Sequence, residues 1–342
     1  MVSILIHRLL QKSIYIFAHL LENLKAVKQF FSLFIKGVFV GAVDVLPGVS
    51  GGTIALAFGI YNDLIHSIHQ FNIKSLGFIL NKDFKTFWNQ SNGNFLLPFF
   101  SGVLIGIFVL ARTIEWLFDH YSVFLWSFFW GLLVFSIYYL IKQIKFSIKI
   151  FLHLFFAAGL SFGISCIGPI DGSSHYLYLF LCGAIGIVAM VLPGISGALI
   201  LIILGVYPLL IERVNHFSMY FLQFNNPLFN DSLLVLSIFL AGVLVGLKIF
   251  VRLLDYLFQR YQSSSYAVLV GIIIGVLYKI WPWQNHPTDH ELTGRLHQLA
   301  WPHQYQDQAH LLGAIILFIL GLSIMVLLKK TGFISFKTTN AS

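Results

Sequence analysis

The chain has 342 residues, of which 58% are hydrophobic and only 10% are charged. Its mean hydropathy is +0.85. A soluble globular domain carries about a quarter of its residues as charged side chains, so this chain has too little polar surface to cover a particle in water. The composition excludes a soluble protein and predicts an all-α polytopic membrane protein.

The formal net charge is +8. The basic residues form no stripe interleaved with aromatic residues, so we expect no nucleic-acid partner. They lie instead beside apolar segments, as cytoplasmic loops do under the positive-inside rule. The clearest examples are Lys142, Lys145, Lys149, Lys329, Lys330 and Lys337.

Residues 1–31 form a basic, partly amphipathic stretch that contains Arg8, Lys12, Lys25 and Lys28. No small-residue cleavage site follows its apolar part, so we do not expect a removed signal peptide. The stretch predicts an interfacial helix on the cytoplasmic face. A short extra span is the alternative.

A long internal repeat runs through the rest of the chain. Val-Leu-Pro-Gly-Val-Ser-Gly at 45–51 recurs as Val-Leu-Pro-Gly-Ile-Ser-Gly at 191–197. In the same order, Gly-Ile-Tyr at 59–61 recurs as Gly-Val-Tyr at 205–207. Later matches pair Arg112 with Arg252, Glu115 with Asp255, Gly131 with Gly271 and Gly159 with Gly321. The chain therefore contains two copies of one unit, at 32–167 and 178–330.

Each copy contains two short apolar arms followed by three segments long enough to span a bilayer. The predicted spans are 95–118, 122–141 and 150–168 in the first copy, and 232–257, 264–281 and 309–328 in the second. The arms are 33–46 and 50–65, then 178–192 and 196–211. They are too short to cross and predict re-entrant helical hairpins with tips at 46–51 and 192–197.

A re-entrant hairpin plus three spans is an odd number of crossings, so the second copy is predicted to be inverted. Both termini are then cytoplasmic. The basic loops 66–94, 142–149 and 258–263 face the cytoplasm, and the more acidic loops 169–177, 212–231 and 282–308 face outward. Inverted repeats with broken helices are typical of alternating-access transporters.

The hairpin tips carry the chemistry that the sequence points to. Proline ends the incoming arm and glycine permits a tight turn or the close approach of a ligand. Ser50 and Ser196 are predicted N-caps of the outgoing arms, whose free amides and positive dipole ends favour an anion such as phosphate. The alternative is that Pro-Gly only kinks two packed helices. The predicted binding residues at the tips are Gly48, Ser50, Gly51, Gly52, Gly194, Ser196 and Gly197.

Arg112 and Arg252 occupy equivalent positions, and each has an acid three residues later, Glu115 and Asp255. Charges inside spans are usually functional, and the guanidinium fork suits phosphate. We predict a role in binding or gating; a self-neutralised pair near the interface is the alternative. Asp44 has an uncharged counterpart in the second copy and is a candidate for proton or cation coupling, or else a partner for a lysine or a backbone amide.

Two other readings are weaker. The region 282–308 holds several histidines, including His286 and His290, but we expect a polar external loop and no metal site. Residues 48–52 fit Gly-x-Ser-x-Gly, the pattern of intramembrane serine hydrolases. That chemistry needs a histidine beside the serine, and nearly all histidines are expected in loops, with His153 the exception. We expect a transporter with no cofactor.

These features resemble the bacterial polyprenyl-phosphate transporter family. The residues that carry the resemblance are Gly-Ala-x-Asp-x-Leu-Pro-Gly-x-Ser-Gly-Gly-Thr at 41–53, Leu-Pro-Gly-Ile-Ser-Gly at 192–197 and the two Arg-x-x-Glu/Asp helices. The resemblance covers about 33–330. It implies return of undecaprenyl phosphate from the outer to the inner leaflet of the bacterial cytoplasmic membrane, for reuse in cell-envelope synthesis. A carrier of another anion is the alternative.

The residues agree with such a substrate, because a lipid phosphate needs a buried polar pocket for its head and a lateral opening for its tail. In the expected mechanism, Ser50, Ser196 and the adjacent amides hold the phosphate at mid-depth. Arg112 and Arg252 receive it at opposite faces as the two copies rock.

Overall fold

The structure is a computed structural model of the chain. It describes residues 24, 27–44, 50–70, 77–78, 81–168, 170–220, 226–285, 298–306, 308–331 and 333. Most of the predicted interfacial helix 1–31, residues 46–49 of the first tip and the centre of the loop 282–308 lie outside these residues. The described part of 1–31, residues 24 and 27–31, is helical.

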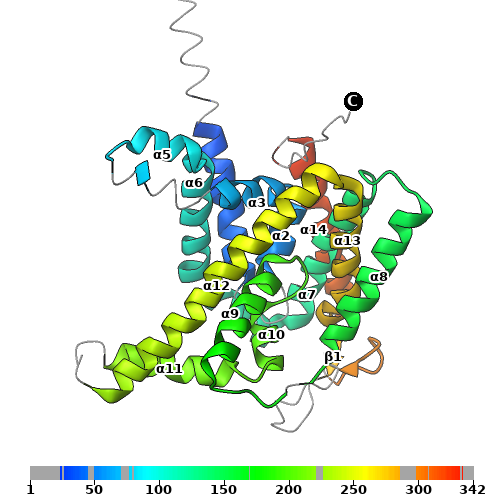
Figure 1. Ribbon diagram of the computed structural model, residues 1–342. Coiled ribbons are helices and arrows are strands. Elements are labelled where there is room, and N and C mark those ends of the chain that lie inside the picture. The colour runs from blue at the N-terminus through cyan, green and yellow to red at the C-terminus, as the bar shows by residue number, and fades with distance from the viewer. Residues whose placement is uncertain are drawn as a thin grey trace, which may run out of the picture.

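The described chain is helical apart from one two-stranded sheet (Figure 1). A helix over residues 27–44 comes first. The later elements are α2 (Gly51–Ala57), α3 (Tyr61–Gln70), α5 (Phe84–Gln90), α6 (Gly93–Ile105), the π-helix η1 (Gly106–Leu110), α7 (Ala111–Ile141), α8 (Ile148–Ser165), α9 (Tyr176–Val191), α10 (Gly197–Ile203), α11 (Tyr207–Met219), α12 (Pro227–Arg260), α13 (Gln262–Val276), the 3-10 turn η2 (Leu277–Ile280), β1 (Gln284–Asn285), β2 (Gln298–Leu299) and α14 (Leu311–Lys330).

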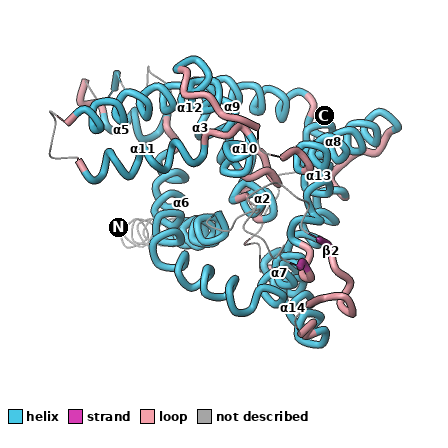
Figure 2. Tube along the Cα trace, turned by 90° about the horizontal axis from the view of Figure 1, so that it is seen from below, coloured by secondary structure: helices cyan, strands magenta, loops and turns pink. Residues whose placement is uncertain are grey.

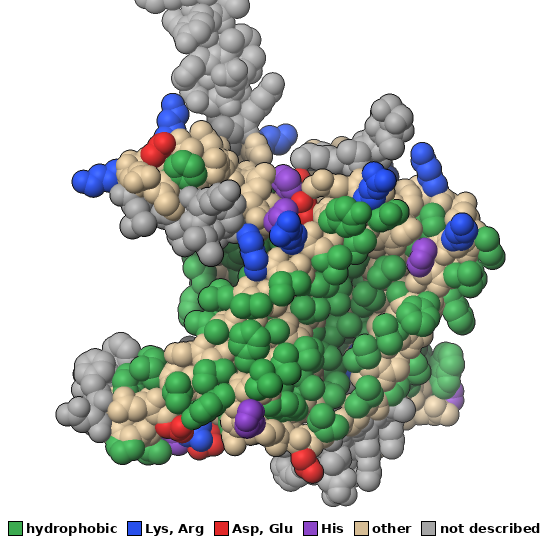
Figure 3. Space-filling view, viewed as in Figure 1, with side chains coloured by type: hydrophobic (Ala, Val, Ile, Leu, Met, Phe, Trp, Pro, Cys, Tyr) green, Lys and Arg blue, Asp and Glu red, His purple; other side chains and the backbone are tan. Residues whose placement is uncertain are grey.

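Six helical segments of the described chain are long and apolar enough to cross a membrane, or seven if the bent pair α10 and α11 forms one span. Many of their large apolar side chains are exposed, among them Phe108, Phe155 and Ile249. Figure 3 shows such side chains covering the middle of the molecule. An aqueous protein does not expose apolar surface on this scale, so the prediction of a helical, multi-pass membrane protein is confirmed.

The outgoing arms of the hairpins differ from the prediction. Residues 50–65 and 196–211 were expected to form one helix each, but both break after seven residues into α2 and α3 and into α10 and α11. Gly59 with φ 69° and Gly205 with φ 67° stand at the breaks, in the left-handed conformation that ends helices. The bend between α10 and α11 is 109°. The repeated Gly-x-Tyr motif is therefore a helix break followed by a new helix start.

The first long spans of both copies end at equivalent tyrosines. Tyr121, with φ −139° and ψ 40°, interrupts α7 between the predicted spans 95–118 and 122–141. Tyr261, with φ −132° and ψ 48°, separates α12 from α13. These nearly identical backbone angles turn the chain in the same way at corresponding places of the two copies.

Glycines allow the closest helix contacts, and they do so at equivalent positions. A Cβ on Gly102 of α6 would lie 2.1 Å from the carbonyl oxygen of Phe34, and one on Gly242 of α12 would lie 2.0 Å from that of Phe180. These separations are far below van der Waals contact, so only glycine fits. The helix over 27–44 therefore packs on α6 as α9 packs on α12.

The remaining spans pair across the copies. Gly131 of α7 lies against the backbone of Phe318 in α14, and Gly271 of α13 lies against that of Leu154 in α8. The last span of each copy therefore packs against a span of the other copy. Figure 2 shows the surrounding helices around the short helix α2, which lies near the middle. The largest apolar core includes Leu56 and Tyr61 from this region, both almost fully buried.

Candidate functional site

The two hairpins meet in the core, close to their tips. The amide of Gly194, in the second tip, donates a 2.7 Å hydrogen bond to the hydroxyl oxygen of Thr53, in α2. Ser50 of the first tip donates from its hydroxyl to the carbonyl oxygen of Leu192 at 3.3 Å and approaches that of Met190 at 3.5 Å. The first tip thus contacts the backbone of the second, and the hydrogen bonds of Ser50 go to backbone groups, not to Ser196.

The junction also closes the end of α9. A helix leaves its last carbonyl oxygens without partners inside the helix, and α9 ends in the core. The hydroxyl of Tyr61, which is 1% exposed, donates to the carbonyl oxygen of Val191 at 3.1 Å. Side chains of the first copy therefore satisfy carbonyl groups of the second, which couples the hairpins.

The anion position expected at the first tip holds a carboxylate of the protein. Ser50 is the N-cap of α2, and its hydroxyl oxygen accepts a 3.2 Å hydrogen bond from the amide of Gly52. The amide of Gly51 donates at 2.8 Å to Oδ1 of Asp44. The first two amides of α2 are therefore engaged, and Asp44 is the partner of a backbone amide.

The second tip differs. Ser196 is the N-cap of α10 by position, but its side chain makes no capping hydrogen bond. Both serines thus stand at the predicted N-cap positions, but only Ser50 makes the side-chain hydrogen bond of a cap. Met190 stands where the first copy has Asp44, so this tip has no carboxylate of its own at that place.

Neighbouring protein atoms leave little room for a side chain at the tip glycines. A Cβ on Gly52 would lie 2.9 Å from the carbonyl oxygen of Val191, and one on Gly197 would lie 3.0 Å from that of Gly186. Gly194 has φ +90°, a conformation that favours glycine. Gly48 lies outside the described residues. Gly52 thus permits the close approach of one hairpin to the other, whereas Gly197 permits the close approach of the two arms of the second hairpin.

A small pocket, with room for about one water molecule, lies beside the junction. Its polar part is formed by Ser50, Thr53 and Gly194, and no charged residue of the described chain lines it. The apolar walls come from α7, α13 and η2, through Leu133, Ile273, Val276, Leu277 and Ile280. In this conformation the pocket is too small for a lipid head group, which can enter only if the surrounding helices separate.

Of the two predicted arginines, Arg252 does not line this pocket. Arg252 is exposed on α12, and no ion pair of it with Asp255 is seen among the described residues, so the alternative of a self-neutralised pair is not found there. The side chains of Arg112 and Glu115 lie outside the described part of the structure. Only their backbone, at the start of α7, is placed.

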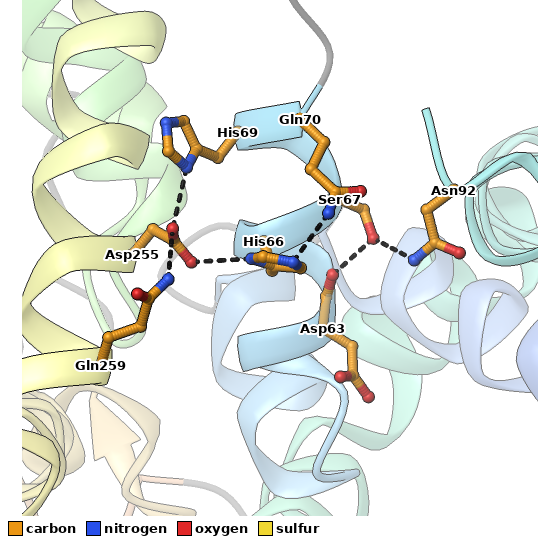
Figure 4. Close-up of polar contacts among 8 residues, drawn as sticks. All are labelled: Asp63, His66, Ser67, His69, Gln70, Asn92, Asp255 and Gln259. Atoms are coloured by element: carbon orange, nitrogen blue, oxygen red, sulfur yellow. Dashed lines mark hydrogen bonds and ion pairs between the residues drawn. The ribbon is translucent and has the colours of Figure 1, made fainter. Parts of the chain in front are cut away.

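Asp255 instead contacts two histidines that the sequence analysis missed. His66 and His69 of α3 place their Nδ1 atoms 3.0 Å and 2.8 Å from the two carboxylate oxygens of Asp255 (Figure 4). The sequence had assigned this segment to a loop beginning at residue 66, and α3 in fact continues to Gln70. The i, i+3 spacing of the two histidines was the available signal.

Comparisons with known proteins identify relatives over most of the chain. The family model described as undecaprenyl phosphate translocase-like matches residues 40–294. A polyprenyl-phosphate transporter of Vibrio cholerae is 36% identical over 259 residues, 75% of this chain and 79% of the relative. A polyprenyl-phosphate transporter of Staphylococcus aureus is 28% identical over 264 residues, 72% of this chain and 85% of the relative. No solved structure gives a significant match.

Proposed function

The chain belongs to the undecaprenyl phosphate translocase-like family, and we propose that it moves undecaprenyl phosphate across the bacterial cytoplasmic membrane, from the outer to the inner leaflet. The observation that carries this proposal is the pocket at the hairpin junction. Its lining combines two hydroxyl groups and a glycine-rich backbone with apolar walls, the groups that a phosphate on a polyprenyl chain requires once the hairpins part to admit it. Reuse of the lipid in cell-envelope synthesis would follow.

The two copies act as inverted repeats in this proposal, each a re-entrant hairpin with three spans. The equivalent breaks at Gly59 and Gly205 and the equivalent turns at Tyr121 and Tyr261 support a common unit. The mutual exchange of last spans supports a two-fold relation between the units, because α14 packs on α7 as α8 packs on α13. Rocking of such units about a central site gives alternating access.

The orientation follows from charge. Figure 3 shows Lys and Arg side chains gathered at the end of the molecule that carries α5, while α11 lies at the opposite end. The positive-inside rule places the α5 end in the cytoplasm, with both termini. The residues that support this assignment include Lys82, Lys85, Lys142, Lys145 and Lys149.

The head group is held at the tips in this mechanism. The second tip is the better acceptor, because Ser196 has no capping bond and the equivalent of Asp44 is Met190. At the first tip, Asp44 already occupies the amide of Gly51. Protonation of Asp44, or exchange of its carboxylate for the phosphate, would couple transport to a proton or another cation. The exposed Arg252 receives the phosphate at the cytoplasmic end and Arg112 at the outer end.

Surface exposure of the lipid in cells tests the proposal. A strain that lacks this protein should display more undecaprenyl phosphate on the outer face, and so bind more of an antibiotic that recognises the lipid phosphate head group. Reintroduction of the gene should restore the low level of antibiotic binding. Equal antibiotic binding with and without the protein, in a strain that lacks other carriers of this lipid, would contradict the proposed function.

A further inference from the structure

The polar cluster of His66, His69, Asp255 and Gln259, here called the α3–α12 clasp, joins the two copies (Figure 4). Both oxygens of Asp255 are engaged by histidine Nδ1 atoms, at 3.0 Å and 2.8 Å. Gln259, one turn further along α12, donates to Oδ2 at 2.8 Å. An ionised carboxylate only accepts hydrogen bonds, so each histidine presents an Nδ1–H group to Asp255.

Surrounding contacts hold the imidazoles in this arrangement. The amide nitrogen of Gln70 lies 2.8 Å from Nε2 of His66, which fits an imidazole that donates through Nδ1 and accepts through Nε2. Lys248 of α12 donates to the backbone carbonyl of His69 at 3.4 Å. The Asp255 side chain is 10% exposed, whereas those of His66 and His69 are 49% and 33% exposed. The two imidazoles therefore lie at the edge of the protein, within reach of water.

The clasp joins polar side chains of the two copies through Asp255. Its two histidine–carboxylate contacts, at 3.0 Å and 2.8 Å, cross from one copy to the other. By contrast, the contacts of Arg213 with Asp231 at 2.7 Å and of His216 with Glu212 at 3.9 Å lie within the second copy. Movement of α3 away from α12 must break the clasp.

The sequence permits the clasp at one end only. In the register of the repeat, Glu212 and Asn215 replace the two clasp histidines, and Glu115 replaces Asp255. The equivalent contact at the other end would thus set a carboxylate against a carboxylate, and like charges repel. The two ends of the molecule are therefore not energetically equivalent, although the helices repeat.

We propose that the α3–α12 clasp is the cytoplasmic gate of the transporter and that the resting protein is closed at this end. This inference rests on the proposed function and adds to it a preferred conformation. His66 and His69 are positioning residues that hold Asp255 and so keep α3 against α12. The resting protein then opens toward the outer leaflet, and release of the lipid into the inner leaflet requires the clasp to part.

Cross-linking tests whether the clasp parts during transport. His69→Cys and Gln259→Cys place two thiols on either side of Asp255 Oδ2 and leave the contact of His66 intact. The two natural cysteines, Cys166 and Cys182, are not disulfide-bonded and are first replaced by alanine. In proteoliposomes, a short cleavable thiol cross-linker should lower translocation of a fluorescent polyprenyl phosphate to the rate of protein-free vesicles, and reductant should restore it.

A second double-cysteine variant controls for effects of cross-linking that do not depend on the clasp. Arg213→Cys with Asp231→Cys replaces an ion pair inside the second copy, and its cross-link should leave the rate unchanged. Equal rates of the cross-linked and reduced clasp variant would overturn the proposed gate. Absence of lipid movement even in the reduced and unmodified proteins would instead overturn the proposed function.

Thiol labelling tests the gate independently of transport. Leu277→Cys places a thiol on the pocket wall. His66→Ala with His69→Ala should speed its labelling by a membrane-impermeant maleimide applied from the cytoplasmic side, because the gate no longer closes. His66→Gln with His69→Gln, which keeps an amide donor at each position, should label more slowly than the alanine pair. Unchanged labelling in the alanine pair would show that the clasp does not close the pocket.

Discussion

The hydroxyl oxygen of Thr53 accepts a 2.7 Å hydrogen bond from the amide of Gly194, and this contact joins α2 of the first hairpin to the tip of the second. Both groups are buried. The bond fixes two segments 141 residues apart in the sequence. It thereby defines the polar side of the pocket in which we place the phosphate.

Replacement of Thr53 by valine should destabilise the protein. Valine keeps the shape of the side chain but leaves the amide of Gly194 buried without its partner, at a cost of about 1–3 kcal/mol. Thr53→Ser keeps the hydroxyl and should retain most of the stability. Unfolding of the purified protein in detergent measures the difference. A valine variant as stable as the natural protein would show that this bond does not hold the hairpins together.

The two tip serines should behave differently. Ser50→Ala removes the cap of α2 and the contact with Leu192, so we expect a loss of about 1 kcal/mol in stability. Ser196 makes no capping bond, and Ser196→Ala should leave stability nearly unchanged. A fall in lipid translocation in the Ser196→Ala variant then reports on head-group binding. If both variants lost the same stability, the different roles assigned to the tips would be wrong.

Asp44→Asn separates the charge of this residue from its hydrogen bond. The asparagine oxygen can still accept from the amide of Gly51, so the first tip should keep its conformation. Without the carboxylate, we expect translocation that no longer responds to an imposed proton or cation gradient. The response of the variant and of the natural protein is compared in proteoliposomes with and without the gradient. An unchanged response would remove Asp44 from the coupling mechanism.

Equivalent glycines of the two copies provide a matched test of the helix packing. A Cβ on Gly321 of α14 would lie 2.4 Å from the carbonyl oxygen of Phe128, whereas nothing lies within 4 Å of one on Gly159 of α8. Gly321→Ala should force α14 away from α7 and cost about 1–3 kcal/mol. Gly159→Ala should be neutral or slightly stabilising, since alanine favours helix. Thermal unfolding of both variants measures the difference in stability. Equal midpoint temperatures would contradict the close packing of α14 on α7.

Local sequence signals predicted the fold well where one residue type determines the backbone. Proline and glycine marked the tips, and apolar length marked the long spans. The breaks at Gly59 and Gly205 were visible as a repeated Gly-x-Tyr motif, yet the arms were predicted as continuous helices. Helices often end at a glycine with a left-handed φ. The recurrence of Gly-x-Tyr at equivalent places in both copies was the signal that each arm ends a helix at this glycine.

The candidate site was harder to predict, because its contacts join distant segments. Asp255 is 189 residues from His66 and 186 from His69, and helical spacing suggested Arg252 as its partner instead. The i, i+3 relation only places two residues near one face of a helix; it does not decide which neighbour a buried carboxylate meets. Thr53 and Tyr61 were missed for the same reason, since their partners are backbone groups of the other copy.

Reconstitution of the purified protein tests the central claim most directly. A fluorescent polyprenyl phosphate is placed in both leaflets of proteoliposomes, and a membrane-impermeant quencher removes the outer signal. We predict that the protected inner pool becomes accessible at a rate proportional to the amount of protein, and that excess unlabelled polyprenyl phosphate slows it. An inner pool that stays protected at every protein level would contradict the assignment of this chain as a polyprenyl-phosphate transporter.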